Sequence, residues 1–368
     1  VNRPIGILMD LQGPKLRVGK FDNGPIFLKQ GKKFTFDLNP QSGNKFRVYL
    51  PHKEVFKRIK KGNKILVDDG KLTLIVTKKN SNYIETKVKF SGFISSSKGF
   101  NIPNVKFGKN MLTKKDREDL RLALKLGVDW IALSFVNEAS DINQAREVLS
   151  ESASRINLIA KIERMVALKQ LYWIIKASDG IMVARGDLAL QSGPGELTGL
   201  QKNIIKQTVK GKKVVITATQ MMESMISNPS PTRAEMTDVS NAVLDGTDAV
   251  MLSAETAIGD YPVETVRAMD EVCKGAETYH QTISGKDEFE YSELQYVDHA
   301  IALSSMSIAR NMDIKAIVTL TESGSTALML SRVRSDIPIY AFTRNVDTQR
   351  RVALYRGVIS HSYPFNVD

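Results

Sequence analysis

The chain has 368 residues, 42% hydrophobic and 25% charged, the balance of a soluble globular protein with two or three domains. No apolar stretch approaches the ~20 residues of a membrane-spanning helix, and the first residues lack the apolar core of a signal peptide. Cys273 is the only cysteine, which excludes an internal disulfide and favours the reducing cytoplasm. The four histidines have no ligand spacing, which argues against a structural zinc site or a histidine-based triad.

The net charge of +12 is unevenly distributed. Residues 15–110 contain 22 Lys and Arg against 6 Asp and Glu, so the remainder of the chain is slightly acidic. A polyanionic partner, either a nucleotide phosphate chain or a nucleic acid, would explain this excess. A solvated lysine-rich surface that keeps sheet edges unpaired would explain it equally well. Nucleic-acid binding needs exposed aromatics between the lysines, whereas we expect the Phe and Tyr residues here to face the core, so we predict no nucleic-acid partner.

In chain order, residues 5–9 are expected to form a buried strand that ends at Asp10 and a turn. Residues 15–110 show short alternating strands separated by turn residues, which predicts a small β-rich module inserted into an α/β domain. A helix from Thr113 to the stop residue Gly127, a strand over 130–135 and a helix from about 140 then restore the βα rhythm.

Four apolar runs with polar tails follow, at 158–163, 180–187, 213–220 and 248–256. Their spacing of roughly 30 residues is that of successive βα units. Parallel strands bring their carboxyl ends to one rim, where α/β enzymes carry their chemistry. One Lys, two carboxylates, one Arg and several hydroxyls on that rim indicate metal-assisted phosphoryl transfer. These residues are Lys161, Glu163, Arg185, Asp187, Thr219 and Ser253.

After a polar stretch at 281–288, which is typical of a linker, a last α/β segment is expected. It contains a helix over 299–311, a strand over 316–320 and a loop over 321–326 that is similar to an anion nest at a helix start. The main sheet has six predicted strands, whereas a closed (β/α) barrel needs eight.

Several motifs together closely resemble pyruvate kinase, in particular its bacterial second-isozyme, potassium-independent group. They are Asp10–Arg17, Val67–Gly70, Ser97–Pro103, Ala160–Glu163, Met182–Leu188, Ile216–Met225, Pro231–Glu235, Asn241–Asp248 and Ser253–Thr256. The resemblance implies an α/β fold: a (β/α)8 TIM barrel, whose first two βα units are missing here, with an inserted small β-barrel cap and a C-terminal α/β domain. The implied domains are 1–14 with 111–275 (barrel), 15–110 (cap) and 276–368 (regulatory, incomplete). We therefore expect a chain truncated at both ends, inactive or prone to aggregation.

The resemblance also implies the reaction and the roles of the rim residues. Pyruvate kinases transfer the phosphoryl group of phosphoenolpyruvate to ADP and then protonate carbon 3 of the enolate. Glu163 and Asp187 would bind Mg²⁺ (or Mn²⁺), and Lys161 would stabilise the transferring group. Gly186 and Asp187 would hold the substrate carboxylate, while Thr219 would contact the substrate and Ser253 would join the proton relay.

On the nucleotide side, Arg17, Lys98 and Asp69 match the family's ADP contacts. Potassium-dependent members carry Glu where this chain has Lys15, so we expect Lys15, paired with Asp10, to replace K⁺. The resemblance further implies an allosteric homotetramer in the cytoplasm, with the effector left open. The alternative is a Mg²⁺-dependent lyase of the phosphoenolpyruvate/pyruvate barrel group, which would lack the inserted cap.

Overall fold

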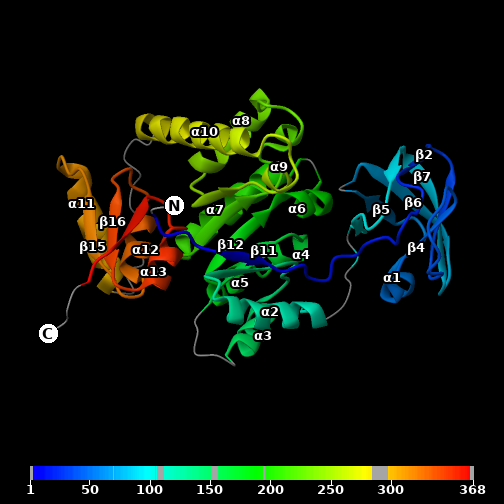
Figure 1. Cartoon of the computed structure of the whole chain (residues 1–368), viewed down its shortest axis with the longest axis horizontal. Coiled ribbons are helices and arrows are strands. Elements are labelled where there is room, and N and C mark those ends of the chain that lie inside the picture. Colours follow the sequence, from blue (N-terminus) through cyan, green and yellow to red (C-terminus); the bar gives the residue numbers. More distant parts are fainter. Residues whose placement is uncertain are drawn as a thin grey trace. The chain divides into compact units, whose positions relative to one another are not determined.

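A computed structural model describes residues 3–68, 70–103, 105, 112–150, 156–193, 195–283 and 297–364, without the side chains of 280–283 and 310 (Figure 1). The chain divides into two units. Unit 1 comprises Val1–Leu11, Lys115–Arg185 and Thr198–Asp368, and unit 2 comprises Gln12–Lys114 and Gly186–Leu197. The domain boundaries expected from the sequence stay a prediction.

Unit 1 is built on a parallel sheet of six strands in the order β1-β10-β11-β12-β13-β14. The strands are β1 (Leu8–Asp10), β10 (Trp130–Leu133), β11 (Asn157–Ile162), β12 (Gly180–Ala184), β13 (Val214–Ala218) and β14 (Ala249–Met251). They are the six strands expected from the apolar runs. The inner strands β10 and β12 are buried along their whole length, as parallel strands covered on both faces must be.

The first strand is shorter than expected. It begins at Leu8 rather than Ile5, and Ile5 and Ile7 each keep 53% of their surface exposed. Among the described strands β1 pairs only with β10, so it lies at a sheet edge where burial is incomplete. The prediction of a buried strand over 5–9 was therefore wrong at its start.

Helices alternate with the strands of this sheet and follow its last strand (Figure 1). They are α2 (Lys114–Leu126), α3 (Ala139–Leu149), α4 (Met165–Leu168), α5 (Leu171–Ala177), α6 (Arg185–Ser192), α7 (Leu197–Lys210), the 3-10 helix η1 (Glu223–Ile226), α8 (Arg233–Leu244), α9 (Ala254–Ala257) and α10 (Pro262–Ile283). Gly127 has a positive φ of 62° and ends α2 as expected. Leu126, the last residue of α2, is 61% exposed. No helix in the described ranges is long and apolar enough to cross a membrane.

The C-terminal part of unit 1 contains a second parallel sheet, β15-β16-β17. Its strands are β15 (Ile317–Leu320), β16 (Ile339–Thr343) and β17 (Val358–Ser362), and its helices are α11 (Val297–Asn311), α12 (Ser325–Arg332) and α13 (Val346–Val352). The expected linker at 281–288 lies mostly outside the described residues. Ala341 and Tyr355 of this part belong to the same buried cluster as Trp130 and Met182, so the two sheets of unit 1 share a core.

Unit 2 is the β-rich cap expected from the sequence, with the sheets β4-β3-β7-β6-β5-β9 and β2-β8. Its elements are β2 (Ile26–Leu28), β3 (Lys33–Asp37), β4 (Arg47–Tyr49), α1 (Lys53–Arg58), β5 (Lys64–Val67), β6 (Leu72–Lys79), β7 (Tyr83–Phe90), β8 (Gly92–Ile94) and β9 (Phe100–Asn101). Phe36 packs edge-on against Phe34 and Phe100 at the centre of a core of its own. The segment 186–197 groups with the cap, and Gln191 Nε2 donates to Asn101 Oδ1 at 3.1 Å.

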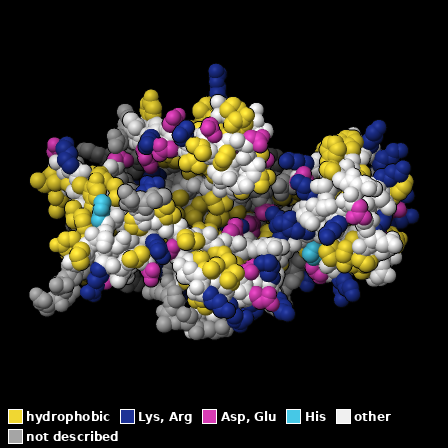
Figure 2. Space-filling view, viewed as in Figure 1, with side chains coloured by type: hydrophobic (Ala, Val, Ile, Leu, Met, Phe, Trp, Pro, Cys, Tyr) yellow, Lys and Arg dark blue, Asp and Glu magenta, His cyan; other side chains and the backbone are white. Residues whose placement is uncertain are grey.

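The prediction that the aromatics of the cap face its core was wrong for five of them. The exposed fractions are 48% for Phe27, 64% for Phe46, 55% for Phe90, 59% for Phe93 and 38% for Tyr83. The ring centres of Phe27 and Phe93 are 5.0 Å apart across the pair β2-β8. The rings of Phe46 and Phe90 each lie under the ammonium group of the lysine that precedes them in the sequence. Figure 2 shows many Lys and Arg side chains on this unit. Core-facing aromatics were the argument against nucleic-acid binding, and that argument no longer holds. The absence of nucleic-acid binding stays a prediction.

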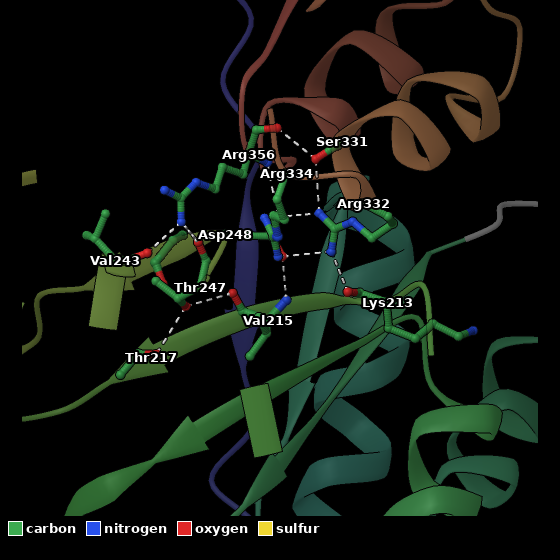
Figure 3. Close-up of polar contacts among 11 residues, drawn as sticks. Lys213, Val215, Thr217, Val243, Thr247, Asp248, Ser331, Arg332, Arg334 and Arg356 are labelled. Atoms are coloured by element: carbon green, nitrogen blue, oxygen red, sulfur yellow. Dashed lines mark hydrogen bonds and ion pairs between the residues drawn. The ribbon is translucent and has the colours of Figure 1, made fainter. Parts of the chain in front are cut away.

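A buried ion cluster joins the two sheets of unit 1 (Figure 3). Asp248, fully buried just before β14, accepts hydrogen bonds from both terminal nitrogens of Arg332 and from Arg334 Nη1 at 3.1 Å. The backbone N–H groups of Val215 and Arg356 also donate to it, at 2.8 and 3.1 Å. Burial would raise the pKa of Asp248, but the two guanidinium groups outweigh it and lower that pKa to about 2. The carboxylate is therefore ionised and bonded both to β13 and to the end of α12.

Candidate active site

Four polar side chains meet at the carboxyl ends of β1, β10 and β11. Lys161 Nζ lies 3.0 and 3.1 Å from the two carboxylate oxygens of Asp10, 2.9 Å from Ser134 Oγ and 3.3 Å from Glu163 Oε1. Lys161 and Glu163 are two residues apart on one strand and so point to the same face. The structure therefore brings together three residues expected at the site and adds Ser134.

Glu163 is held in a fixed orientation. Its side chain is 3% exposed, and Oε2 accepts a 2.6 Å hydrogen bond from the backbone N–H of Phe135. Phe135 has a left-handed φ of 59°, a conformation that costs a non-glycine residue about 1–2 kcal/mol. The Arg164 guanidinium lies 4.7 Å from the centre of the Phe135 ring. Strain of this kind persists where surrounding contacts impose it, and it is typical of functional sites.

The charge of Lys161 is secured by its neighbours. Burial alone would lower the pKa of its ammonium group, but the carboxylates of Glu163 and Asp10 outweigh burial and raise that pKa above its ordinary value. The group is thus a permanent cation in a largely water-excluded position. A fixed cation of this kind can stabilise negative charge that develops on a reacting oxygen.

The segment after β13 contains the next expected residue, Thr219. Thr219 and Gln220 both adopt left-handed backbone conformations, with φ of 70° and 53°. The Thr219 hydroxyl donates to the carbonyl of Ala218 at 2.6 Å. Arg185, 5% exposed, donates to the backbone carbonyls of this segment and forms an ion pair with Asp238 at 2.6 Å. Arg185 therefore contacts the backbone that presents Thr219.

Two further carboxylates accept hydrogen bonds from residues that follow Thr219 in the chain. Glu255, 2% exposed, accepts hydrogen bonds from the N–H groups of Met222 at 3.2 Å and Ser253 at 2.7 Å. Glu235 accepts from both the N–H and the hydroxyl of Ser224, at 2.7 and 2.6 Å. Ser253, expected in the proton relay, begins the short helix α9, and its backbone is tied to the Thr219 segment through Glu255.

In unit 2, the expected residues Gly186 and Asp187 lie in the first turn of α6. The positive end of the helix dipole favours an anion at this position. Asp187 forms an ion pair with Lys15 at 3.5 Å. We expected Lys15 to pair with Asp10, but the ion pair that Asp10 makes is with Lys161. Lys161 reaches both carboxylate oxygens of Asp10 within unit 1, whereas Lys15 belongs to unit 2, so the expected pair of Lys15 with Asp10 stays a prediction.

The expected nucleotide contacts lie side by side on the cap. Arg17 forms an antiparallel bridge with Gly99, next to Lys98 in the chain, and its Nη1 donates to the carbonyl of Ser97 at 2.8 Å. The Lys98 ammonium is 2.9 Å from Asp68 Oδ1. The third expected contact, Asp69, lies outside the described residues. The cap thus carries two cations on neighbouring segments of the chain, a suitable arrangement for a phosphate chain.

The residues present fit a divalent cation only if other groups complete its coordination. In the ranges that the structure describes, no group of three or more His, Cys, Asp or Glu side chains could hold a metal ion. Glu163 and Asp187 supply the hard carboxylate oxygens that Mg²⁺ prefers, and Mg²⁺ is commonly bound by one or two carboxylates plus substrate oxygens. The donor chemistry therefore suits a metal that arrives with its substrate.

Sequence reasoning missed three partners of the site. Ser134 directly follows β10. Polar residues at the carboxyl ends of parallel strands were the signal for Lys161, and the same signal could have identified Ser134. Phe135 takes part through its backbone, and Asp238 pairs with a residue 53 positions away in the sequence. No local pattern signals contacts of these last two kinds.

Comparison with known proteins identifies the family. The family model "Pyruvate kinase, barrel domain" matches residues 1–266, and "Pyruvate kinase, alpha/beta domain" matches residues 299–368. The chain belongs to the pyruvate kinase family. It is 46% identical over 364 residues to "Pyruvate kinase" of Buchnera aphidicola subsp. Acyrthosiphon pisum and 44% identical over 364 residues to "Pyruvate kinase II" of Salmonella typhimurium. Each alignment covers 97% of this chain and 76% of the relative.

Family membership confirms two predictions made from the sequence. The resemblance to pyruvate kinase is borne out, including its second-isozyme group, and so is a TIM-like barrel followed by an α/β domain. As a member of a family of phosphotransferases the chain is an enzyme, and nothing in the comparisons favours the lyase alternative.

Proposed function

We propose that this chain transfers the phosphoryl group of phosphoenolpyruvate to ADP, giving pyruvate and ATP. The observation that carries the proposal is the cluster of Lys161, Glu163 and Asp10 at the strand ends of a barrel that a pyruvate kinase model matches over residues 1–266. Lys161 and Glu163 are largely buried in it, whereas the Asp10 side chain is 44% exposed. Phosphoryl transfer requires positioning and positive charge around a transition state that spreads negative charge over oxygens. A charged lysine fixed by two carboxylates meets that requirement.

Pyruvate kinases need a divalent metal, and we assign it in this chain to Glu163 and Asp187. Both ligands are carboxylates, so Mg²⁺, or Mn²⁺ in its place, is the cation they suit. When bound, the metal would neutralise charge on the phosphoryl oxygens. The Lys15 ammonium, now paired with Asp187, would have to yield that oxygen to the metal.

Four further residues, with Lys161, position the substrate and move a proton. Gly186 and Asp187, at the start of α6, favour the substrate carboxylate through the helix dipole. The Thr219 hydroxyl relays a proton to carbon 3, with Ser253 behind it in the same relay. Lys161 stabilises first the transferring phosphoryl group and then the enolate oxygen.

On the cap, Arg17 and Lys98 bind the phosphates of ADP, and Asp69 is the acidic residue of the same nucleotide site. The excess of Lys and Arg over residues 15–110 attracts the nucleotide tetraanion to this unit. Closing of the cap excludes water from the transferring group, as lids do in other transferases. Beyond the substrates, we propose a cytoplasmic homotetramer under allosteric control that needs no K⁺.

The test of this function is the Lys161→Met variant. The unmodified full-length protein should form ATP from phosphoenolpyruvate and ADP with Mg²⁺ present. Loss of the fixed ammonium should lower that rate by about 10²–10³-fold or more, the usual effect of removing a charge-stabilising group. A coupled assay of pyruvate measures the rate. Near-normal turnover of the variant would contradict the role of Lys161.

The metal assignment is tested separately with Asp187→Asn, which keeps the shape and removes one charge. Mn²⁺ affinity, followed by electron spin resonance, should fall in this variant and persist in Lys161→Met, because only the former loses a ligand. Asp37→Asn is the matched control, since Asp37 is also on the cap and also ion-paired, to Arg47. Equal Mn²⁺ affinity in the Asp187 and Asp37 variants would place the metal elsewhere.

A further inference from the structure

The guanidinium of Arg185 is wrapped by the backbone of the Thr219 segment. Nη2 donates to the carbonyls of Thr219 at 2.7 Å and Gln220 at 3.1 Å, and it lies 2.7 Å from Met221 Sδ. Nε donates to the carbonyls of Ala218 at 3.4 Å and Thr219 at 3.3 Å. Three consecutive carbonyl groups therefore converge on one buried cation.

This convergence explains how the segment keeps an unfavourable backbone. Two successive left-handed residues are rare outside glycine, and the β-branched Thr219 is poorly suited to that region. Carbonyls that turn inward together repel one another unless a donor lies between them. A guanidinium offers five N–H groups in a rigid fork and so can hold all three carbonyls at once, whereas an ammonium group cannot span them.

The other end of the fork is fixed by helices. Arg185 Nη1 lies 2.8 and 2.6 Å from the two carboxylate oxygens of Asp238 on α8 and 3.4 Å from Gln201 Oε1 on α7. A buried guanidinium needs such a counter-charge. The Asp238 side chain is 40% exposed. A substitution of Asp238 therefore removes a partly exposed carboxylate and leaves the Arg185 side chain itself unchanged.

We propose that the Arg185–Asp238 pair is a positioning device that fixes the Thr219 hydroxyl for proton delivery. This deepens the proposed function and rests on it. After phosphoryl transfer the enolate of pyruvate remains. One proton, drawn from solvent through Thr219, forms a C–H bond at carbon 3 while the enolate oxygen becomes the ketone oxygen, with no net oxidation. Arg185 touches no reacting atom and acts through the backbone of Thr219.

The pair should therefore affect protonation more than phosphoryl transfer. Two variants test this: Asp238→Asn, which removes the counter-charge, and Arg185→Lys, which keeps the positive charge but loses the fork. Protonation is followed by NMR as exchange of the pyruvate methyl hydrogens for deuterium, with Mg²⁺ and ATP present. Phosphoryl transfer is followed as ATP formed from phosphoenolpyruvate and ADP. Arg146→Lys is the matched control, because Arg146 also bonds a carbonyl, that of Ala177, and an aspartate, Asp179.

We expect exchange to slow by on the order of 10²-fold in Arg185→Lys, the typical effect of a misplaced reacting group, and by a smaller factor in Asp238→Asn. ATP formation should change much less in both, and neither rate should change in Arg146→Lys. Equal losses in the two rates, or no loss in exchange, would overturn the proposal. An unmodified full-length protein that forms no ATP would instead contradict the proposed function, so the two failures are distinguishable.

Discussion

Lys15 places a permanent positive charge next to a proposed metal ligand. Its ammonium lies 3.5 Å from Asp187, on the unit that also holds Arg17 and Lys98. A potassium ion near this ammonium would be repelled by about 4 kcal/mol at 4 Å, with an effective dielectric constant near 20. We infer that Lys15 makes K⁺ unnecessary.

The Lys15→Glu variant should therefore acquire a potassium requirement. Its rate in tetramethylammonium buffer should fall well below its rate in potassium buffer, whereas the unmodified chain should work equally well in both. Lys33→Glu is the matched control, since Lys33 pairs with Glu85 at the same distance of 3.5 Å, also on the cap. Strong activation of the unmodified chain by K⁺ would contradict the prediction.

Cys273 should be unreactive at neutral pH. Burial in α10, followed by the negative charges of Glu277 and Asp270, raises the pKa of its thiol to about 11. The reactive thiolate should then be about 100-fold scarcer than at an ordinary cysteine. Iodoacetamide labelling at pH 7.5, followed by mass spectrometry, checks this, with the chain unfolded in guanidinium as the fast reference. Equal labelling rates in the two states would contradict it.

Between elements, the cluster around Asp248 joins the start of β14 to the end of α12 (Figure 3). The folded-state pKa of about 2 lies below the ordinary value of 3.8, so the stabilisation is complete above pH 4 and is lost as the pH falls toward 2. The shift corresponds to roughly 2 kcal/mol. Part of the acid sensitivity of unit 1 should come from this one carboxyl group.

The Asp248→Asn variant tests this contribution. It should unfold at a lower temperature than the unmodified chain at pH 5, because the buried guanidinium groups lose their counter-charge. The difference in Tm should shrink toward pH 2, where the native carboxyl group is itself protonated. Asp313→Asn, which breaks an exposed ion pair with Lys315, should leave Tm unchanged. A Tm difference that does not depend on pH would refute the assignment.

At the scale of the whole molecule, the described residues form more than one hydrophobic cluster. The cap core around Phe36 shares no residue with the cluster of Trp130 and Met182 in unit 1. Phe36 is fully buried and packs against two other rings. Separate cores favour local unfolding of one unit while the other stays folded.

The Phe36→Ala variant should destabilise the cap by about 3–5 kcal/mol and leave unit 1 protected. Amide hydrogen exchange should accelerate in β3 and β7 but not in β11 or β12. Leu158→Ala, at a fully buried position in β11, is the converse control and should accelerate exchange in unit 1 alone. Faster exchange in both units from either variant would show that they unfold as one.

The sequence by itself determined the strands, their polar ends and the family. A buried parallel strand reads as a continuous apolar run, and the carboxyl ends of such strands meet at one rim, so Lys161, Glu163 and Thr219 could be identified without a structure. Only the tertiary structure decided which charges pair: Lys161 with Asp10, Lys15 with Asp187, and Arg185 with Asp238 and the carbonyls around Thr219. Long side chains can reach many partners, and the choice among them depends on ångström differences in the packing of distant elements that no local pattern encodes.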